Sequence, residues 1–140
     1  MTMIFEPRLL LDTNIVTYTS SDTDWKDLYE PILFGKKLYI CFMTLAELLE
    51  SVRHRKMSEK NIRIYVNKIQ EKYSMIQWNE TICDNFAIIR VQRRNRPISV
   101  PDALIAATAL AYELPLVTHN ARDFDGIDGL NVISKYQKGE

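Results

Sequence analysis

The sequence predicts an α/β fold built on a central, mainly parallel sheet of short strands. Short apolar runs of strand length alternate along the chain with longer segments whose apolar residues recur at helical spacing. Such alternation is typical of parallel sheets covered by crossover helices. The chain has 140 residues, of which 46% are apolar, and no Pro/Gly/Ser-rich linker divides it. We therefore expect a single domain over residues 1–140.

The first half of the chain supplies two strands and two helices. Residues 9–11 are three leucines that end at Asp12, which predicts a short buried strand. An amphipathic helix over residues 24–34 follows, with Asp22 or Thr23 as its cap and Gly35 after its end. The next elements are a strand over residues 37–42 and a helix that starts at the capping box Thr44-Leu45-Ala46-Glu47.

The second half alternates in the same way. Ser58 is expected to cap a helix with apolar residues at helical spacing. Asn79 starts a helix that runs towards Arg94, and Pro97 stops it. The predicted helices cover residues 59–73, 79–94 and 99–114, and the predicted strands cover residues 75–78, 116–118 and 131–133, with a polar loop over residues 119–129.

Composition excludes several classes of protein. Lys plus Arg and Asp plus Glu number 18 each, so total charge excludes a polybasic nucleic-acid binder. With 4 glycines, the chain has neither a GxGxxG nor a GxxxxGK(S/T) phosphate loop. Cys41 and Cys83 lie in apolar stretches and are expected to be buried free thiols of a reducing compartment. No segment approaches about 20 apolar residues, so we expect a cytoplasmic protein without a membrane span.

Four acidic residues fall at one predicted edge of the sheet. Asp12 follows the first strand, Glu47 and Asp102 lie in the first turns of helices, and Asp123 follows the strand over residues 116–118. Strand carboxyl ends and crossover-helix N-termini share one edge of a parallel sheet. Clustered carboxylates need a compensating cation, and oxygen ligands without Cys or His select Mg²⁺ or Mn²⁺.

Each acid also has a purely structural interpretation. Glu47 completes a capping box with Thr44, and Asp102 suits the positive end of a helix dipole. Asp12 could cap the turn after it, and Asp123 could be an ordinary polar loop residue. Their common edge favours the metal site.

Four segments in this order carry a resemblance that spans almost the whole chain. They are LLDTNI at residues 10–15, TLAEL at residues 44–48, PDALIAATA at residues 101–109 and LVTHNARDF at residues 116–124. Together they resemble the motifs of the PIN domain, and more narrowly those of the VapC-type toxins of bacterial and archaeal toxin–antitoxin pairs. The chain also carries residues before the Asp12 motif that many members lack, and their role stays open.

This resemblance implies a metal-dependent ribonuclease with a three-layer α/β/α sandwich. It places the three acidic metal ligands of the family at Asp12, Glu47 and Asp102. The fourth acid stands in some members where this chain has Asn120 and in others at Asp123, so Asn120, Asp123 and the nearby Asp125 stay open as the residue that completes the site.

Three polar residues are candidates for supporting roles. Thr118 matches the Thr or Ser that ends the fourth strand of the family, and its hydroxyl is expected to orient a metal-binding carboxylate. Asn14 is expected to hold the Asp12 loop, and Asn120 to lie beside the ligands. The alternative for Thr118 is an ordinary strand-end threonine.

Four arginines are candidate RNA contacts. Arg90, Arg93 and Arg94 share a helix face at i, i+3 and i+4, and Arg96 follows them. They are expected to form an exposed rim that contacts phosphates, or else simply to complement the C-terminal end of the helix dipole. His119 lies near the acids but is expected to be a surface residue.

The sequence therefore predicts a Mg²⁺- or Mn²⁺-dependent endoribonuclease in which a metal-activated water hydrolyses the phosphodiester. Asp12, Glu47, Asp102 and Asp123 are the catalytic and metal-binding candidates. The expected partners are RNA, a cognate antitoxin and a second copy of the chain, with the helices over residues 24–34 and 59–73 as possible dimer contacts. The alternatives are an RNA-processing PIN nuclease outside a toxin pair and a catalytically silent PIN-like binding module. A phosphatase is disfavoured because Asp12-Thr13-Asn14 lacks a second aspartate.

Overall fold

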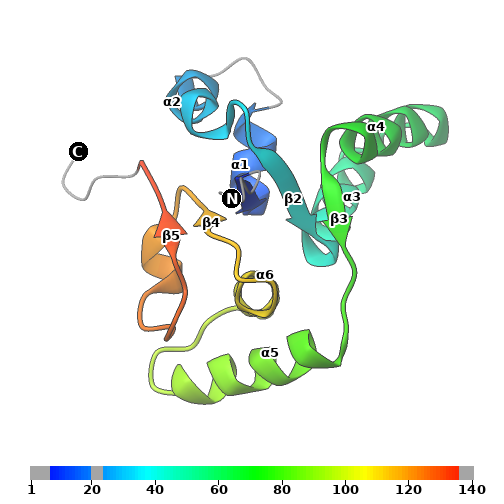
Figure 1. Cartoon of the computed structure of the whole chain (residues 1–140). Coiled ribbons are helices and arrows are strands. Elements are labelled where there is room, and N and C mark those ends of the chain that lie inside the picture. Colours follow the sequence, from blue (N-terminus) through cyan, green and yellow to red (C-terminus); the bar gives the residue numbers. More distant parts are fainter. Residues whose placement is uncertain (1–6, 20–23, 136–140) are drawn as a thin grey trace, which may run out of the picture.

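A five-stranded, entirely parallel sheet forms the centre of the molecule in the computed structural model, which describes residues 7–19 and 24–135 (Figure 1). The strand order is β3-β2-β1-β4-β5, so the first strand in sequence lies in the middle. The strands are β1 (Arg8–Leu11), β2 (Lys37–Cys41), β3 (Ser74–Ile76), β4 (Leu116–Val117) and β5 (Val132–Ile133). The predicted parallel α/β fold is confirmed.

Helices cover both faces of this sheet and make the predicted three layers (Figure 1). Successive side chains of β1 point to opposite faces, so Leu10 joins one core while Leu9 and Leu11 join the other. The first core contains α5 (Glu80–Gln92) and α6 (Val100–Ala111), and the second contains α1 (Thr13–Thr19), α2 (Asp24–Leu33) and α4 (Glu59–Lys72). Helix α3 (Phe42–His54) adds Leu48 to the second core, and the short 3₁₀ helix η1 (Ala121–Phe124) adds Phe124 to the first.

Most predicted helix boundaries are confirmed by the caps. The side chains of Ser58, Asn79 and Ser99 accept hydrogen bonds from backbone N–H groups three residues later. Gly35 has a φ of 72°, the left-handed conformation expected after the end of α2. The proposed cap of α2 at Asp22 or Thr23 lies outside the described residues, as do the first six residues of the chain.

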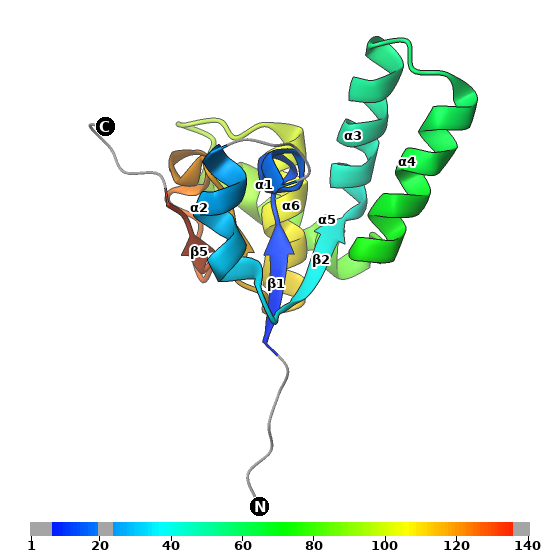
Figure 2. The same ribbon diagram turned by 90° about the horizontal axis from the view of Figure 1, so that it is seen from above.

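The predicted capping box of Thr44 and Glu47 is wrong. Strand β2 passes directly into α3, with Cys41 as the N-cap whose sulfur accepts from the Met43 N–H at 3.4 Å. Helix α3 therefore begins before Thr44, which is fully buried, and Glu47 lies in the second turn instead of the first. Helices α3 and α4 then form a hairpin that projects from the body of the domain (Figure 2).

Two further expectations need correction. Residues 13–19 form α1, although the sequence suggested no helix there. Cys41 is a buried free thiol as predicted, but Cys83 is free and only partly buried, because it lies beside the exposed side of α5. In the described part of the chain, no helix is long and apolar enough to cross a membrane.

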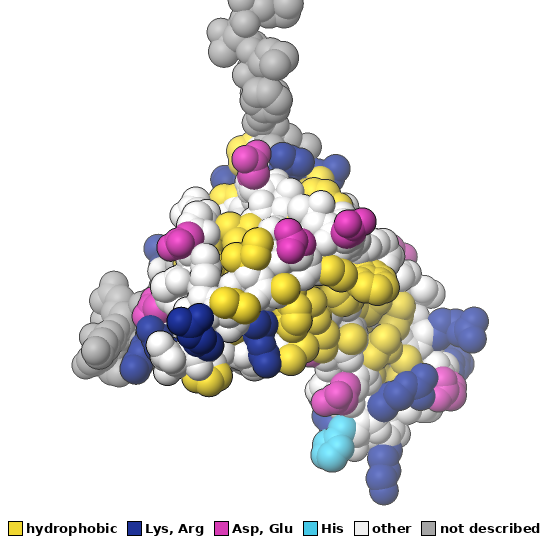
Figure 3. Space-filling view, turned by 90° about the horizontal axis from the view of Figure 1, so that it is seen from below, with side chains coloured by type: hydrophobic (Ala, Val, Ile, Leu, Met, Phe, Trp, Pro, Cys, Tyr) yellow, Lys and Arg dark blue, Asp and Glu magenta, His cyan; other side chains and the backbone are white. Residues whose placement is uncertain are grey.

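Exposed apolar side chains lie on several helices. Hydrophobic side chains gather on the face of the molecule that carries α5 (Figure 3), where Ile88 and Val91 are exposed. Leu28 of α2 and Ile64 of α4 are also exposed, within the two helices considered for a dimer contact. The homodimer stays a prediction.

Candidate active site

The four acidic candidates, which come from four separate segments of the chain, line one hollow of about 470 Å³. Asp12 directly follows β1, Glu47 lies on α3, Asp102 lies in the first turn of α6 and Asp123 lies on η1. All four segments meet at the carboxyl edge of the sheet, as the sequence predicted. The remaining lining residues are Thr13, Asn14, Thr17, Ser99, Pro101 and Asn120.

Asp12 is the most buried of these acids, with 5% of its surface exposed. Its Oδ2 accepts a hydrogen bond from the Thr118 hydroxyl at 2.6 Å, and its Oδ1 accepts from the Thr13 N–H at 2.8 Å. The pKa of the Asp12 carboxyl is raised from 3.8 to about 6, mainly by burial and to a lesser extent by the Asp102 charge, against the lowering by the Thr118 hydrogen bond. The carboxylate form of Asp12 is therefore costly in this position without a nearby cation.

Thr118 holds Asp12 in the way that the family resemblance implied. The Thr118 hydroxyl donates to Asp12 and accepts from the Asn120 N–H at 3.1 Å, which ties β1 to the loop after β4. The Asn14 Oδ1 accepts from the His119 N–H at 3.3 Å and joins α1 to the same loop. These bonds fix the backbone around the hollow, although the supporting roles themselves stay predictions.

Glu47 is positioned by a threonine that the sequence did not single out. The Thr13 hydroxyl donates to the Glu47 Oε1 at 2.7 Å and lies 3.1 Å from the Thr44 hydroxyl. Because Thr13 follows Asp12 directly, one short segment orients two of the four acids. Its position directly after Asp12 is the only hint of this role in the sequence.

Asp102 and Asp123 are the other two acids that line the hollow. The Asp102 N–H donates to the Ser99 side chain at 3.2 Å, so the cap of α6 also places this acid. Burial raises the pKa of Asp102, and the charges of Asp123 and Glu47 raise it further. Asp125 does not line the hollow, because its carboxylate turns to Arg96, with 3.5 Å between the charged atoms.

The donor chemistry of this hollow fits a hard divalent cation. Its charged lining residues are all carboxylates, without Lys, Arg or His. Among residues 7–19 and 24–135, however, no three Asp, Glu, His or Cys side chains are grouped so that they could hold a metal ion as they stand. Asp12 and Glu47 accept hydrogen bonds from threonine hydroxyls, which orient them, and the four acids would have to draw closer together to hold one ion. Ligation by the four acids stays a prediction.

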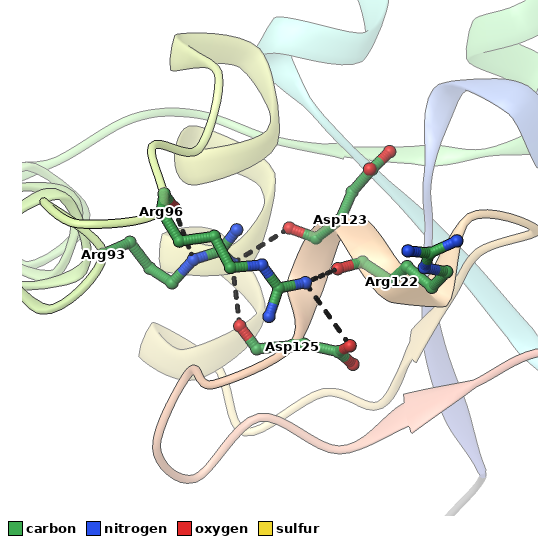
Figure 4. Close-up of polar contacts among 5 residues, drawn as sticks. All are labelled: Arg93, Arg96, Arg122, Asp123 and Asp125. Carbon is green, nitrogen blue, oxygen red and sulfur yellow. Dashed lines mark hydrogen bonds and ion pairs between the residues drawn. The ribbon is translucent and has the colours of Figure 1, made fainter.

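The predicted exposed arginine rim is partly wrong. Arg93 is only 7% exposed, and it caps α5 instead of extending the helix face. Its guanidinium donates to the carbonyl oxygens of Arg96, Asp123 and Asp125 at 2.9, 3.1 and 2.8 Å (Figure 4). Arg93 therefore fastens η1 to the end of α5 and is not an exposed phosphate contact.

The other three arginines also differ from one another. Arg90 donates to the Ile98 carbonyl at 2.8 Å and lies over the Phe86 ring. Arg94 is exposed but lines none of the hollows at this edge. Arg96 lines a second hollow beside the acidic one, together with Arg122, which the sequence reasoning did not select.

His119 is buried and not a surface residue, with 7% of its surface exposed. Its Nδ1 lies 2.8 Å from the Tyr29 hydroxyl of α2, and burial lowers its pKa. Its ring packs edge-to-face against the Tyr29 ring and lines neither of the hollows at this edge.

The comparison with known families decides what kind of domain this is. The family model described as "PIN domain" matches residues 9–130, which include all four acids. The chain belongs to the PIN-domain family. The resemblance stated from the sequence motifs is thereby confirmed.

Named relatives of this PIN domain are ribonucleases. "Ribonuclease VapC1" of Haemophilus influenzae strain R2866 is 29% identical over 125 residues, covering 86% of this chain and 92% of the relative. "tRNA(fMet)-specific endonuclease VapC" of Shigella flexneri is 26% identical over 125 residues, with 88% and 94% covered. A solved structure of VapBC-1 from nontypeable Haemophilus influenzae is 28% identical with a TM-score of 0.76, and the match covers 91% of this chain and 97% of that one.

Proposed function

We propose that this chain is an endoribonuclease and the toxin of a toxin–antitoxin pair. One observation carries the nuclease: four carboxylates of a PIN domain converge on a single open hollow at the carboxyl edge of its sheet. Relatives with similar sequences are named ribonuclease and endonuclease, which supports RNA as the substrate. The PIN nuclease outside a toxin pair and the silent binding module are the outcomes against which this proposal is tested.

The residues of the hollow suit hydrolysis of a phosphodiester by water. When bound, Mg²⁺ or Mn²⁺ would activate a water molecule and neutralise charge on the leaving oxygen. Asp12, Glu47, Asp102 and Asp123 would hold the ion. Thr118 fixes the direction of the Asp12 carboxylate, and Thr13 fixes that of Glu47. Such pre-set ligands lower the cost of assembling the site when RNA and metal arrive.

The toxin assignment adds a protein partner and a location. Solved relatives include the toxin–antitoxin complexes VapBC-1 of Haemophilus influenzae and one from Klebsiella pneumoniae, which supports a cognate antitoxin for this chain. A toxin that cleaves cellular RNA acts in the cytoplasm, and this location is part of the proposal. A small neighbouring reading frame for a DNA-binding antitoxin would favour the toxin over an RNA-processing enzyme.

Cleavage of RNA by the purified chain is the direct test. Wild type should cut total RNA when Mg²⁺ or Mn²⁺ is present and leave it intact in EDTA. Asp102→Asn should lose at least about 100-fold in rate, because a neutral amide binds Mg²⁺ poorly. Asp102 is partly exposed, so this variant should fold normally. Its free energy of unfolding should lie within about 0.5 kcal/mol of that of wild type.

The outcomes separate the three functions. Metal-dependent cleavage that is lost in Asp102→Asn, together with growth arrest on expression, supports the toxin. Cleavage without growth arrest supports the nuclease function and contradicts the toxin function. RNA binding without cleavage under any metal would identify a silent binding module.

A further inference from the structure

Two hollows of opposite charge lie side by side at the edge of the sheet. The acidic hollow has only carboxylates as charged groups, whereas the second hollow, of about 620 Å³, is lined by three arginines and two aspartates. They share Ser99, Asp102, Asn120 and Asp123 as walls. The protein has a formal net charge of zero, so this contrast is local. A ligand that spans both hollows meets acids on one side and guanidinium groups on the other.

The three arginines of the second hollow are engaged to different degrees. Arg93 is buried, and its guanidinium donates hydrogen bonds to three backbone carbonyls. Arg96 donates through one nitrogen to the Arg122 carbonyl at 2.9 Å and reaches Asp125 at 3.5 Å, with 57% of its side chain exposed (Figure 4). The guanidinium of Arg122 has no hydrogen bond or ion pair to any residue of the described part of the chain.

We propose that the second hollow is a phosphate-binding subsite, in which Arg122 and Arg96 hold an RNA phosphate next to the one at the acidic hollow. This inference rests on the proposed nuclease function. An RNA backbone repeats its negative charge at every nucleotide, and an acidic hollow alone repels it. Guanidinium groups match phosphate oxygens with two parallel hydrogen bonds, so Arg122 and Arg96 would hold the chain in place.

Arg93 has a different part in this subsite. By binding the carbonyls of Asp123 and Asp125, it holds η1 against the end of α5. In Figure 4 the Asp123 carboxylate points away from the Arg93 and Arg96 guanidinium groups. The acid therefore stays available to the acidic hollow although arginines surround its backbone. The same short helix thus places Asp123 on the wall between the two hollows and Arg122 in the second hollow alone.

Binding of a labelled single-stranded oligoribonucleotide of mixed sequence, without divalent cations, tests the subsite. Arg122→Ala should weaken binding about tenfold, as expected for the loss of a charged hydrogen bond. It should also lower the slope of log affinity against log salt by about 0.7, the value for one phosphate contact with a single strand. Arg122→Lys should retain the salt slope and recover part of the affinity, because lysine keeps the positive charge but cannot make the two parallel hydrogen bonds of a guanidinium group.

The matched control is Arg63→Ala, which removes an exposed arginine of α4 that lines neither hollow. It should match wild type in affinity and slope. Arg96→Ala should behave like Arg122→Ala. The melting temperature of Arg122→Ala should equal that of wild type, because its side chain holds no other described residue.

Cleavage kinetics separate this inference from the nuclease proposal. Arg122→Ala should raise KM about tenfold with kcat within about twofold of wild type, because the lost contact lies outside the reacting phosphate. A wild type that cleaves RNA, combined with an Arg122→Ala variant of unchanged KM and salt slope, overturns the subsite and leaves the nuclease. An equal loss of RNA affinity in Arg63→Ala also overturns the subsite, because the loss would then follow from the change in net charge and not from a contact in the second hollow. A wild type that neither binds nor cleaves RNA overturns both proposals.

Discussion

Replacing Asp12 by Asn should stabilise the metal-free protein. The Asp12 carboxyl is nearly buried, and its pKa is raised from 3.8 to about 6. That difference corresponds to about 3 kcal/mol of lost folding free energy at pH 7, when the group is ionised. Asn can still accept from the Thr13 N–H through its amide oxygen, but the amide nitrogen that replaces Oδ2 cannot accept from the Thr118 hydroxyl. The mismatch between this amide nitrogen and the Thr118 hydroxyl should offset about 1–2 kcal/mol of the gain.

The net stabilisation of about 1–2 kcal/mol should be visible as a rise of roughly 3–7 °C in melting temperature at pH 7. The difference should depend on pH. The folded protein binds the Asp12 proton more tightly than the unfolded chain, so wild-type stability should rise as the pH falls from 7 through 6 towards 3.8. Between pH 7 and pH 5 this group contributes about 1.3 kcal/mol, which Asp12→Asn should lack.

Thermal melts of both proteins in EDTA, at pH 7 and pH 5, measure these effects. Asp84→Asn is the matched control, because Asp84 is an exposed acid of α5 outside the hollow, and it should stay within about 0.5 kcal/mol of wild type. If Asp12→Asn melts at or below wild type at pH 7, and the gap is the same at pH 5, burial does not raise the energy of this carboxylate and the reasoning fails.

Three further predictions concern metal, Glu47 and Arg93. Adding Mn²⁺ at 100 times its Kd should stabilise wild type by about 2.7 kcal/mol and Asp12→Asn far less, and a melt indifferent to Mn²⁺ would contradict the metal site. Glu47→Gln keeps an oxygen that can accept from the Thr13 hydroxyl. The free energy of unfolding of this variant should therefore lie within about 1 kcal/mol of that of wild type. The same variant should lose at least about 100-fold in RNA cleavage, and near-wild-type cleavage would remove Glu47 from the ligand set. Arg93→Ala should lower the free energy of unfolding by about 2–4 kcal/mol in denaturant melts, because three carbonyls lose a charged donor. A change within about 0.5 kcal/mol would contradict this, since water would then replace these hydrogen bonds without cost.

The sequence by itself determined the order of the elements and the edge at which the acids meet. Apolar runs such as residues 9–11 have the length of strands, and segments with helical spacing separate them, which is the pattern of a parallel sheet with helical crossover connections. The cap at Ser58 is local chemistry, so it could be assigned without tertiary information. The placement of Asp12, Glu47, Asp102 and Asp123 follows from topology, since strand ends and helix starts share one edge.

The tertiary structure alone decided how each side chain is used. Glu47 and Thr44 fit a capping box by spacing, but β2 packs so that α3 starts earlier, at Phe42, and both side chains turn to Thr13. Arg93 and Arg122 are the same residue type near the same hollow, yet one is buried against three carbonyls while the other has no partner among the described residues. Hydrogen-bond partners far apart in sequence, such as Asp12 and Thr118, depend on packing between elements, and local sequence carries no record of that packing.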